Sequence, residues 1–171
     1  MSLPKRKVLR IQGYNYSNTG VYFITICTQN RKELLGNIHN AIMNKSECGK
    51  YVEYCINKIA EKYPFINVDT YVVMPNHVHL LLSINEKFYD KNTLAQRTLP
   101  KVIQQFKSNS KKLYNIFGQH FGQRDTLPLQ WQRNYYEHIV RNEKEYLEIY
   151  NYIENNPLAW ELDTYYKNGI D

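Results

Sequence analysis

Two histidines stand two residues apart, at His77 and His79, inside the apolar run 71–84. Strand side chains alternate between faces, so both imidazoles are expected on one side of a sheet, with the apolar residues between and after them on the other. Two neighbouring imidazoles make half of a site for a divalent metal ion. A polar pair on a solvated face is the alternative interpretation, but the flanking hydrophobicity and a tyrosine further along the chain favour the metal site.

A second group with suitable chemistry lies near the C-terminus, where Tyr152 and Asn156 are four residues apart on an expected helix. Side chains at that spacing are stacked one turn above the other. The amide oxygen could complete a metal shell with the imidazoles, and the phenol could attack a phosphorus atom whose oxygens the metal polarises. Tyr146 and Tyr150 are rivals for the nucleophile, but their spacing places them on the stripe expected to pack against the sheet.

The elements that must position these groups are predicted from periodicity and turn signals. Their order is strand, helix, strand, strand, helix, strand, helix. In chain order they cover residues 21–28, 46–63, 66–74, 77–84, 94–116, 129–140 and 142–156. The predicted fold class is α+β: a ferredoxin-like antiparallel sheet with the helices packed on one face and the catalytic tyrosine on the C-terminal helix.

Several residues mark the ends of these elements. Asn142 is predicted to cap the last helix with Glu145 as its reciprocal partner, and Pro157 is predicted to end that helix. Pro100 interrupts or begins the helix over 94–116. The turn at residues 74–76 is too short for a crossover, so the strands on either side of it must form an antiparallel hairpin.

A chain of 171 residues is predicted to form one domain over residues 1–171, with residues 1–20 as a basic N-terminal arm. It has no apolar run near the roughly 18 residues that a membrane span needs, and no signal peptide. A cytoplasmic protein without a membrane partner is therefore expected. The three cysteines lack the spacing of zinc sites, and no cysteine chemistry is predicted.

Charge and aromatic content point to an anionic partner. Lysine and arginine total 22 against 16 acidic residues, which gives a formal net charge of +6. The chain also has 16 tyrosines, whose rings can stack on bases and whose hydroxyls can bond phosphates. A basic, tyrosine-rich surface suits single-stranded nucleic acid, although half-buried packing must account for several of the tyrosines.

Further candidates share a basic or aromatic side chain that could contact DNA. They are Arg10, Tyr14, Tyr16, Lys107, Lys111, Arg133 and Arg141. Solvated lysines and surface salt bridges are the competing explanation for the charged members. Glu137 and His138 could support the metal ligands or act as a base, or could be an exposed pair at a strand end.

The sequence resembles the single-tyrosine HUH transposases of bacterial insertion sequences, most of all the REP-associated tyrosine transposases. His77-Val-His79 matches the His-hydrophobic-His motif and follows the Val-Met-Pro-Asn that the family carries. Residues 131–142 are similar to the segment before the catalytic helix. Tyr152-Ile-Glu-Asn-Asn-Pro157 resembles the family's Tyr-Ile-x-x-Asn-Pro, and the match spans about residues 10–160.

The resemblance implies a ferredoxin-like HUH endonuclease that cuts and joins single-stranded DNA at ends marked by hairpins. It places His77, His79 and Asn156 as ligands of a divalent metal, Mg²⁺ or Mn²⁺. It places Tyr152 as the nucleophile, giving a 5′-phosphotyrosine and a free 3′-hydroxyl. Because imidazole is an unusual ligand for Mg²⁺, other divalent ions are expected to substitute.

Two other functions remain open at this point. A non-catalytic single-stranded nucleic-acid-binding module of ferredoxin-like fold would show exposed aromatics on the sheet and no metal dependence. A hydrolytic metalloenzyme would need carboxylates near the histidines, and the sequence places none convincingly. The oligomeric state, monomer or homodimer, is also open; the short path from Arg141 into the last helix favours a site completed within one chain.

Overall fold

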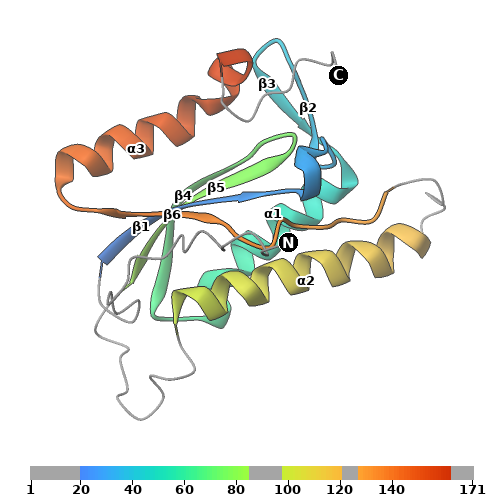
Figure 1. Ribbon diagram of the computed structural model, residues 1–171, viewed down its shortest axis with the longest axis horizontal. Helices are drawn as coiled ribbons and strands as arrows, with labels where there is room; N and C mark the ends of the chain where they lie inside the picture. The colour runs from blue at the N-terminus through green and yellow to red at the C-terminus, as the bar shows by residue number, and fades with distance from the viewer. Residues whose placement is uncertain (1–19, 85–97, 121–126, 163–171) are drawn as a thin grey trace, which may run out of the picture.

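The centre of the fold is a four-stranded antiparallel sheet with strand order β4-β5-β1-β6 (Figure 1). In the computed structural model, residues 20–84, 98–120 and 127–162 are described. The four strands are β1 (Gly20–Cys27), β4 (Ile66–Val73), β5 (His77–Ile84) and β6 (Tyr136–Val140). The two central strands, β5 and β1, are the ones that carry the histidines and the residues opposite them.

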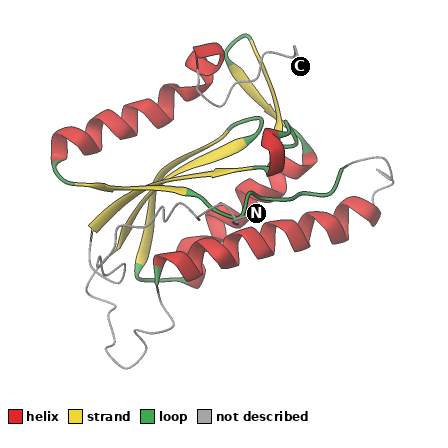
Figure 2. Cartoon of the chain, in the orientation of Figure 1, coloured by secondary structure: helices red, strands yellow, loops and turns green. Residues whose placement is uncertain are grey.

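Two helices cover one face of this sheet and the third covers the other (Figure 2). Helix α1 (Glu47–Lys62) and helix α2 (Leu99–His120) lie below the sheet in this view, and α3 (Glu143–Asn155) lies above it. The antiparallel, ferredoxin-like α+β prediction is confirmed, but the expectation that all helices share one face is wrong for α3. Helices α1 and α2 each connect two strands of the sheet, whereas α3 follows the edge strand β6 and can fold over the opposite face.

The main core lies between the sheet and the pair α1 and α2. Strand residues of this face are fully buried, among them Ile24, Leu80 and Leu82, and they meet apolar residues of the helices such as Ile56 and Ile103. The opposite face of β5 is also covered, so every residue from 77 to 82 is buried. Burial on both faces explains why this strand is almost continuously apolar and why its two histidines are hidden from water.

The capping residues act close to the way the sequence predicts. The Ser46 hydroxyl accepts a hydrogen bond from the Gly49 backbone at 3.1 Å and donates to the Leu34 carbonyl at 2.7 Å. At α3, the Asn142 side chain accepts from the Glu145 backbone at 2.9 Å. The Glu145 carboxylate accepts from the backbone of Arg141 at 2.7 Å, one residue before the cap itself.

A second, two-stranded sheet of β2 (Gly36–His39) and β3 (Ile42–Lys45) was not predicted. Its strands have four residues each, and its turn places Asn40 and Ala41 at positive φ of 50° and 60°. Two positive φ angles are typical of the tight hairpin turn that suits twisted strands. The sequence has Asn40 at the first turn position but lacks the glycine that usually follows it, so the signal for the hairpin is weak.

Three boundaries also differ from the prediction. Helix α2 continues to His120, beyond the expected end at 116. Past the end of α3, a 3-10 helix, η4 (Asn156–Leu162), carries the chain through Pro157. Only the last part of the segment 129–140 forms a strand; before it, the Lys107 ammonium on α2 donates to the carbonyls of residues 132, 133 and 134 at 3.0, 3.3 and 3.2 Å.

No helix in the described part of the chain is long and apolar enough to cross a membrane.

The start of α1 packs tightly on the preceding loop, and Gly49 makes that contact possible. A Cβ at this position would overlap the carbonyl oxygen of Leu35, which already accepts the backbone N–H of Ser46 at 2.9 Å. We expect Gly49→Ala to lower the free energy of unfolding by about 1–3 kcal/mol, because either the helix or the loop must move. Urea unfolding with an unchanged m-value measures this loss.

Gly20→Ala is the matched control, because the nearest atoms to a Cβ there are 3.6 Å away, in the ring of Tyr22. That variant should stay within about 0.5 kcal/mol of the parent. Equal stability of the two variants would contradict the close packing of α1 on the loop at Leu35.

Candidate active site

The two histidines lie side by side on the α3 face of the sheet. His77 and His79 are 0% and 1% exposed, and their Nε2 atoms are 3.0 Å apart. The rings meet edge to face, with centroids 4.5 Å apart. Strand pairing places Cys27 opposite His77 and Thr25 opposite His79, so residues of β1 lie next to both histidines.

Each imidazole is held through its other nitrogen. The Nδ1 atom of His77 lies 2.8 Å from the side-chain oxygen of Asn76, and Nδ1 of His79 lies 2.8 Å from the hydroxyl of Thr25. An amide oxygen can only accept, so His77 donates from Nδ1 and its Nε2 lone pair faces His79 when the ring is neutral. The Thr25 hydroxyl can donate or accept, so it can support His79 with either nitrogen protonated. These bonds fix both rings with their Nε2 atoms converging.

Burial keeps both rings uncharged. It lowers the pKa of His79 to about 3. The pKa of His77 is also well below its usual value, first because of burial and then because of the nearby charges of His79 and Arg31. Neutral imidazoles have a lone pair to offer a metal ion, whereas protonated ones do not.

Among the three rival tyrosines of α3, Tyr152 is the one that reaches the histidines. Its hydroxyl lies 3.3 Å from Nε2 of His79, while the side chain remains 43% exposed. Tyr146 instead hydrogen-bonds to the carboxylate of Asp69 on β4. Tyr150 packs beside Tyr146, with ring centroids 6.2 Å apart. The phenol of Tyr152 is therefore both close to the imidazoles and accessible from outside.

Asn156 is buried to 1% exposure, and its side-chain oxygen has no hydrogen-bond partner in the structure described. It lies between two contacts on the same stretch of chain: Tyr152, four residues before, meets His79, and Trp160, four residues after, meets the ring of His77 at 6.0 Å. A buried acceptor without a donor carries a free-energy cost, unless a ligand satisfies it. This orphaned oxygen fits a third metal ligand.

The donor set suits a divalent ion of intermediate softness. No group of three His, Cys, Asp or Glu that could hold a metal occurs in the described residues, so a site here depends on the amide of Asn156. Two imidazole nitrogens and one amide oxygen form a softer set than the oxygen ligands that Mg²⁺ prefers. Such a set can also accept Mn²⁺, Co²⁺ or Ni²⁺.

Sequence reasoning missed residues that only the fold brings to the histidines. Thr25 is one, because strand register places it opposite His79; Phe23 is another, with its ring stacked on His79 at 5.2 Å. Arg31 follows β1 in a turn with φ of 52°, and its charge is close enough to lower the pKa of His77. No sequence pattern reveals a left-handed backbone at a non-glycine residue, so the position of Arg31 could not be predicted.

The two residues expected to support the ligands do not contact them. Glu137 is paired with Ile24, so its side chain is on the α1 and α2 face of the sheet; the expectation that it supports the histidines is wrong. His138 is on the correct face, opposite Phe23, but its Nε2 atom pairs with the Glu145 carboxylate at 2.6 Å. This hydrogen bond joins β6 to the first turn of α3.

The candidate DNA contacts fall into three groups. The Lys107 ammonium donates to backbone carbonyls, and burial lowers the pKa of this group to about 8. These contacts differ from the phosphate contact that was expected of Lys107. Three candidates have exposed side chains, namely Lys111, Arg133 and Arg141. The remaining candidates, Arg10, Tyr14 and Tyr16, lie outside the described residues.

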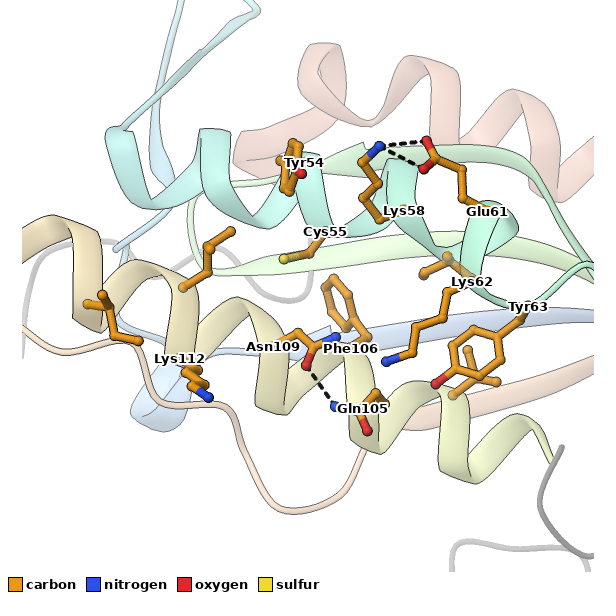
Figure 3. A pocket seen from close by; sticks show the side chains of 14 residues that line it. Tyr54, Cys55, Lys58, Glu61, Lys62, Tyr63, Gln105, Phe106, Asn109 and Lys112 are labelled. Carbon is orange, nitrogen blue, oxygen red and sulfur yellow. Dashed lines mark hydrogen bonds and ion pairs between the residues drawn. The ribbon is translucent and has the colours of Figure 1, made fainter.

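A cavity of about 530 Å³ lies elsewhere, between α1 and α2 (Figure 3). Its floor is apolar, and Lys58, Lys62 and Lys112 lie around it. Both helices belong to the face opposite the histidines, and the cavity contains none of the predicted site residues. The candidate chemistry is therefore concentrated on the α3 face.

Comparison with known proteins agrees with this fold and identifies the family. The family model described as "Transposase IS200 like" matches residues 17–156. An uncharacterized protein of Haemophilus influenzae is 37% identical over 94% of this chain and 93% of its own length. The REP-associated tyrosine transposase of Escherichia coli is 23% identical over 90% of this chain and 81% of its own.

The solved structure of a REP-associated tyrosine transposase bound to a REP hairpin has the same fold, with a TM-score of 0.52 and 22% identity. That alignment covers 94% of this chain and 74% of the other. The chain belongs to the IS200-like transposase family. Its likeness to the REP-associated tyrosine transposases, expected from the sequence motifs, is confirmed.

The two buried neutral imidazoles make stability depend on pH. Their pKa values are lowered in the folded chain, so the unfolded chain, with a usual histidine pKa of about 6.5, binds more protons below that pH. We expect the metal-free protein to lose up to about 1.4 kcal/mol per pH unit for each ring between about pH 6.5 and pH 5. Urea unfolding with a chelator present, repeated at several pH values, measures the slope.

His79→Leu should reduce this slope, because one of the two neutral rings is gone. His39→Gln is the control, since His39 is exposed on the β2–β3 hairpin, and it should leave the slope unchanged. An unaltered slope in the His79 variant would show that the ring is not held neutral by burial.

Proposed function

We propose that this transposase cuts and rejoins single-stranded DNA through the phenol of Tyr152. In the first step the phenol releases its proton to water, its oxygen attacks phosphorus, the bond from phosphorus to the 3′ oxygen breaks, and that oxygen takes up a proton from water. The products are a 5′-phosphotyrosine and a free 3′-hydroxyl, and the covalent link conserves the bond for rejoining. The observation that carries the proposal is the 3.3 Å distance from the Tyr152 hydroxyl to Nε2 of His79.

A divalent metal ion fits the converging donors of this site. His77, His79 and Asn156 would hold it through two Nε2 atoms and the orphaned amide oxygen. When bound, the ion supplies charge that polarises the phosphate oxygens, which a phenol with a pKa near about 10 needs in order to be an effective nucleophile.

The surrounding residues have positioning tasks in this proposal. Thr25 and Asn76 hold the two imidazoles in register through their Nδ1 atoms. Thr70 on β4 donates to the carboxylate of Glu154 at 2.5 Å, which fixes α3 to the sheet at a residue midway between Tyr152 and Asn156. The phenol thus approaches the histidines from a helix anchored on the same sheet.

Single-stranded DNA with hairpin ends is the proposed substrate. The solved relative that carries a REP hairpin supports this choice, together with the net charge of +6. Arg133, Arg141 and Lys111 are exposed and could contact phosphates, and the basic arm over residues 1–20 could grip a hairpin stem. Because His79 and Tyr152 of one chain already meet, we propose that a single chain completes the site.

Replacement of the phenol tests the nucleophile. We expect Tyr152→Phe to abolish the covalent adduct with a single-stranded oligonucleotide that carries a hairpin, since it removes only the attacking oxygen. Tyr150→Phe should retain the adduct, because that phenol does not face His79. Denaturing gels with a labelled oligonucleotide report the adduct, with Mn²⁺ or Mg²⁺ in one series and a chelator in the other.

An adduct that persists in Tyr152→Phe would overturn the assignment. Adduct formation that a chelator does not reduce would overturn the role of the metal. Binding of the oligonucleotide with no adduct under any condition would favour a non-catalytic binding module.

A further inference from the structure

Helix α3 lies closest to the β4 and β5 half of the face on which the histidines lie. It packs over β4 and β5, where the Tyr146–Asp69 and Glu154–Thr70 hydrogen bonds fix it. The β1 and β6 half of this face is more open: Phe23 and His138 are only half-buried there, although Tyr152 and Glu145 of α3 contact them. The exposed aromatic residue there is Tyr136, at the start of β6, with 50% of its side chain accessible.

Strand register connects this open half directly to the site. Tyr136 is opposite Thr25, and Thr25 is opposite His79, so the three residues form one row across β6, β1 and β5. Two strand spacings separate the ends of the row, which places the Tyr136 backbone about 10 Å from that of His79. All three side chains point to the same face.

Aromatic rings bridge that distance. Tyr136 meets Phe23 with ring centroids 6.2 Å apart at 70°. Phe23 in turn meets Tyr152 at 6.1 Å and 86°, and stacks on His79 at 5.2 Å and 29°. A continuous aromatic surface therefore runs from the open edge of the sheet to the phenol that is proposed to attack DNA.

We propose that Tyr136 and Phe23 form a stacking platform for the bases of single-stranded DNA next to the bond that Tyr152 attacks. The inference rests on the proposed function, because it extends the same site. Single-stranded nucleic acid is the occupant that the surface fits: rings of this kind stack on bases of any sequence, and unpaired bases are needed to reach them. Exposed arginines stand near both ends of β6, Arg133 before it and Arg141 after it, where phosphates of a strand crossing the platform would find positive charge.

A platform of this kind would position the strand without touching the metal ligands. Stacking restrains the bases on one side of the scissile phosphate, and α3 borders the open surface on the other. The phosphate between them is then presented to a phenol that is already 43% exposed. The predicted effect of Tyr136 is therefore on DNA binding and not on metal binding.

The test uses a single-stranded dT20 oligonucleotide with a fluorescent label, a chelator, and the Tyr152→Phe protein as background, so that binding is measured without cleavage. We expect Tyr136→Ala to raise Kd about tenfold, whereas Tyr136→Trp keeps a ring and should stay near the parent. Tyr54→Ala is the matched control: Tyr54 is 53% exposed on α1, on the other side of the sheet, and its loss should not change Kd.

A second measurement keeps the inference testable if a variant folds poorly. An oligonucleotide with 2-aminopurine at successive positions should show quenching by the parent protein at one or two bases only, since stacking on a ring quenches this base. An unchanged Kd in Tyr136→Ala, an equal loss in Tyr136→Trp, or an equal loss in Tyr54→Ala would each overturn the platform. A change in oligomeric state with unchanged DNA binding would overturn it too, and would make the surface a protein contact.

The outcome is independent of the nucleophile assignment. If Tyr152 forms the adduct while Tyr136→Ala binds DNA normally, the platform alone is wrong. If Tyr136→Ala weakens binding and no adduct forms with any tyrosine, the proposed chemistry alone is wrong.

Discussion

The structure depends on two uncharged imidazoles held 3.0 Å apart inside the protein. Burial of such groups is unfavourable unless their polar atoms are satisfied, and each ring meets this requirement at Nδ1 through Asn76 or Thr25. What remains is a pair of Nε2 atoms that face each other with no carboxylate described beside them. A cation bound between the two nitrogens would replace their mutual hydrogen bond and would also satisfy the buried, unpartnered side-chain oxygen of Asn156.

Helix α3 is attached to the sheet chiefly through polar contacts at selected points. Ile153 is its one buried residue within the α-helix, in contrast to the five buried residues of α1. Its position is set instead by hydrogen bonds to β4 and by the hydrogen bond between His138 and Glu145 at its first turn. This leaves the phenol of Tyr152 close to His79 and yet reachable by a large substrate, which a helix buried along its length would not allow.

Sequence patterns predicted the elements that make the site because those elements carry strong local signals. The alternation in β5 and the cap at Asn142 are local properties. The strand, the helix and the four-residue spacing of Tyr152 and Asn156 along that helix could therefore be predicted from them. The face occupied by α3 did not follow, because it depends on the path of the chain after β6. Thr25, Phe23 and Arg31 were missed for the same reason: only strand register and tertiary folding bring them to the histidines.

On the more open β1 and β6 half of the face, the aromatic residues extend from the candidate active site to the edge of the sheet. His79 lies beside the phenol of α3, Asn156 directly follows that helix, and the aromatic surface continues from Phe23 to Tyr136. Tyr136 has no role in holding the imidazoles, so binding of DNA and binding of metal are carried by different side chains of one sheet face.

The central claim is that the two imidazoles and the amide of Asn156 bind one cation. Crystals grown with Mn²⁺ and measured for anomalous scattering test it most directly. The account predicts one strong anomalous peak within coordination distance of Nε2 of His77, Nε2 of His79 and the side-chain oxygen of Asn156. A peak bound elsewhere, or a site that remains without density while the two Nε2 atoms keep their hydrogen bond at saturating Mn²⁺, would contradict it.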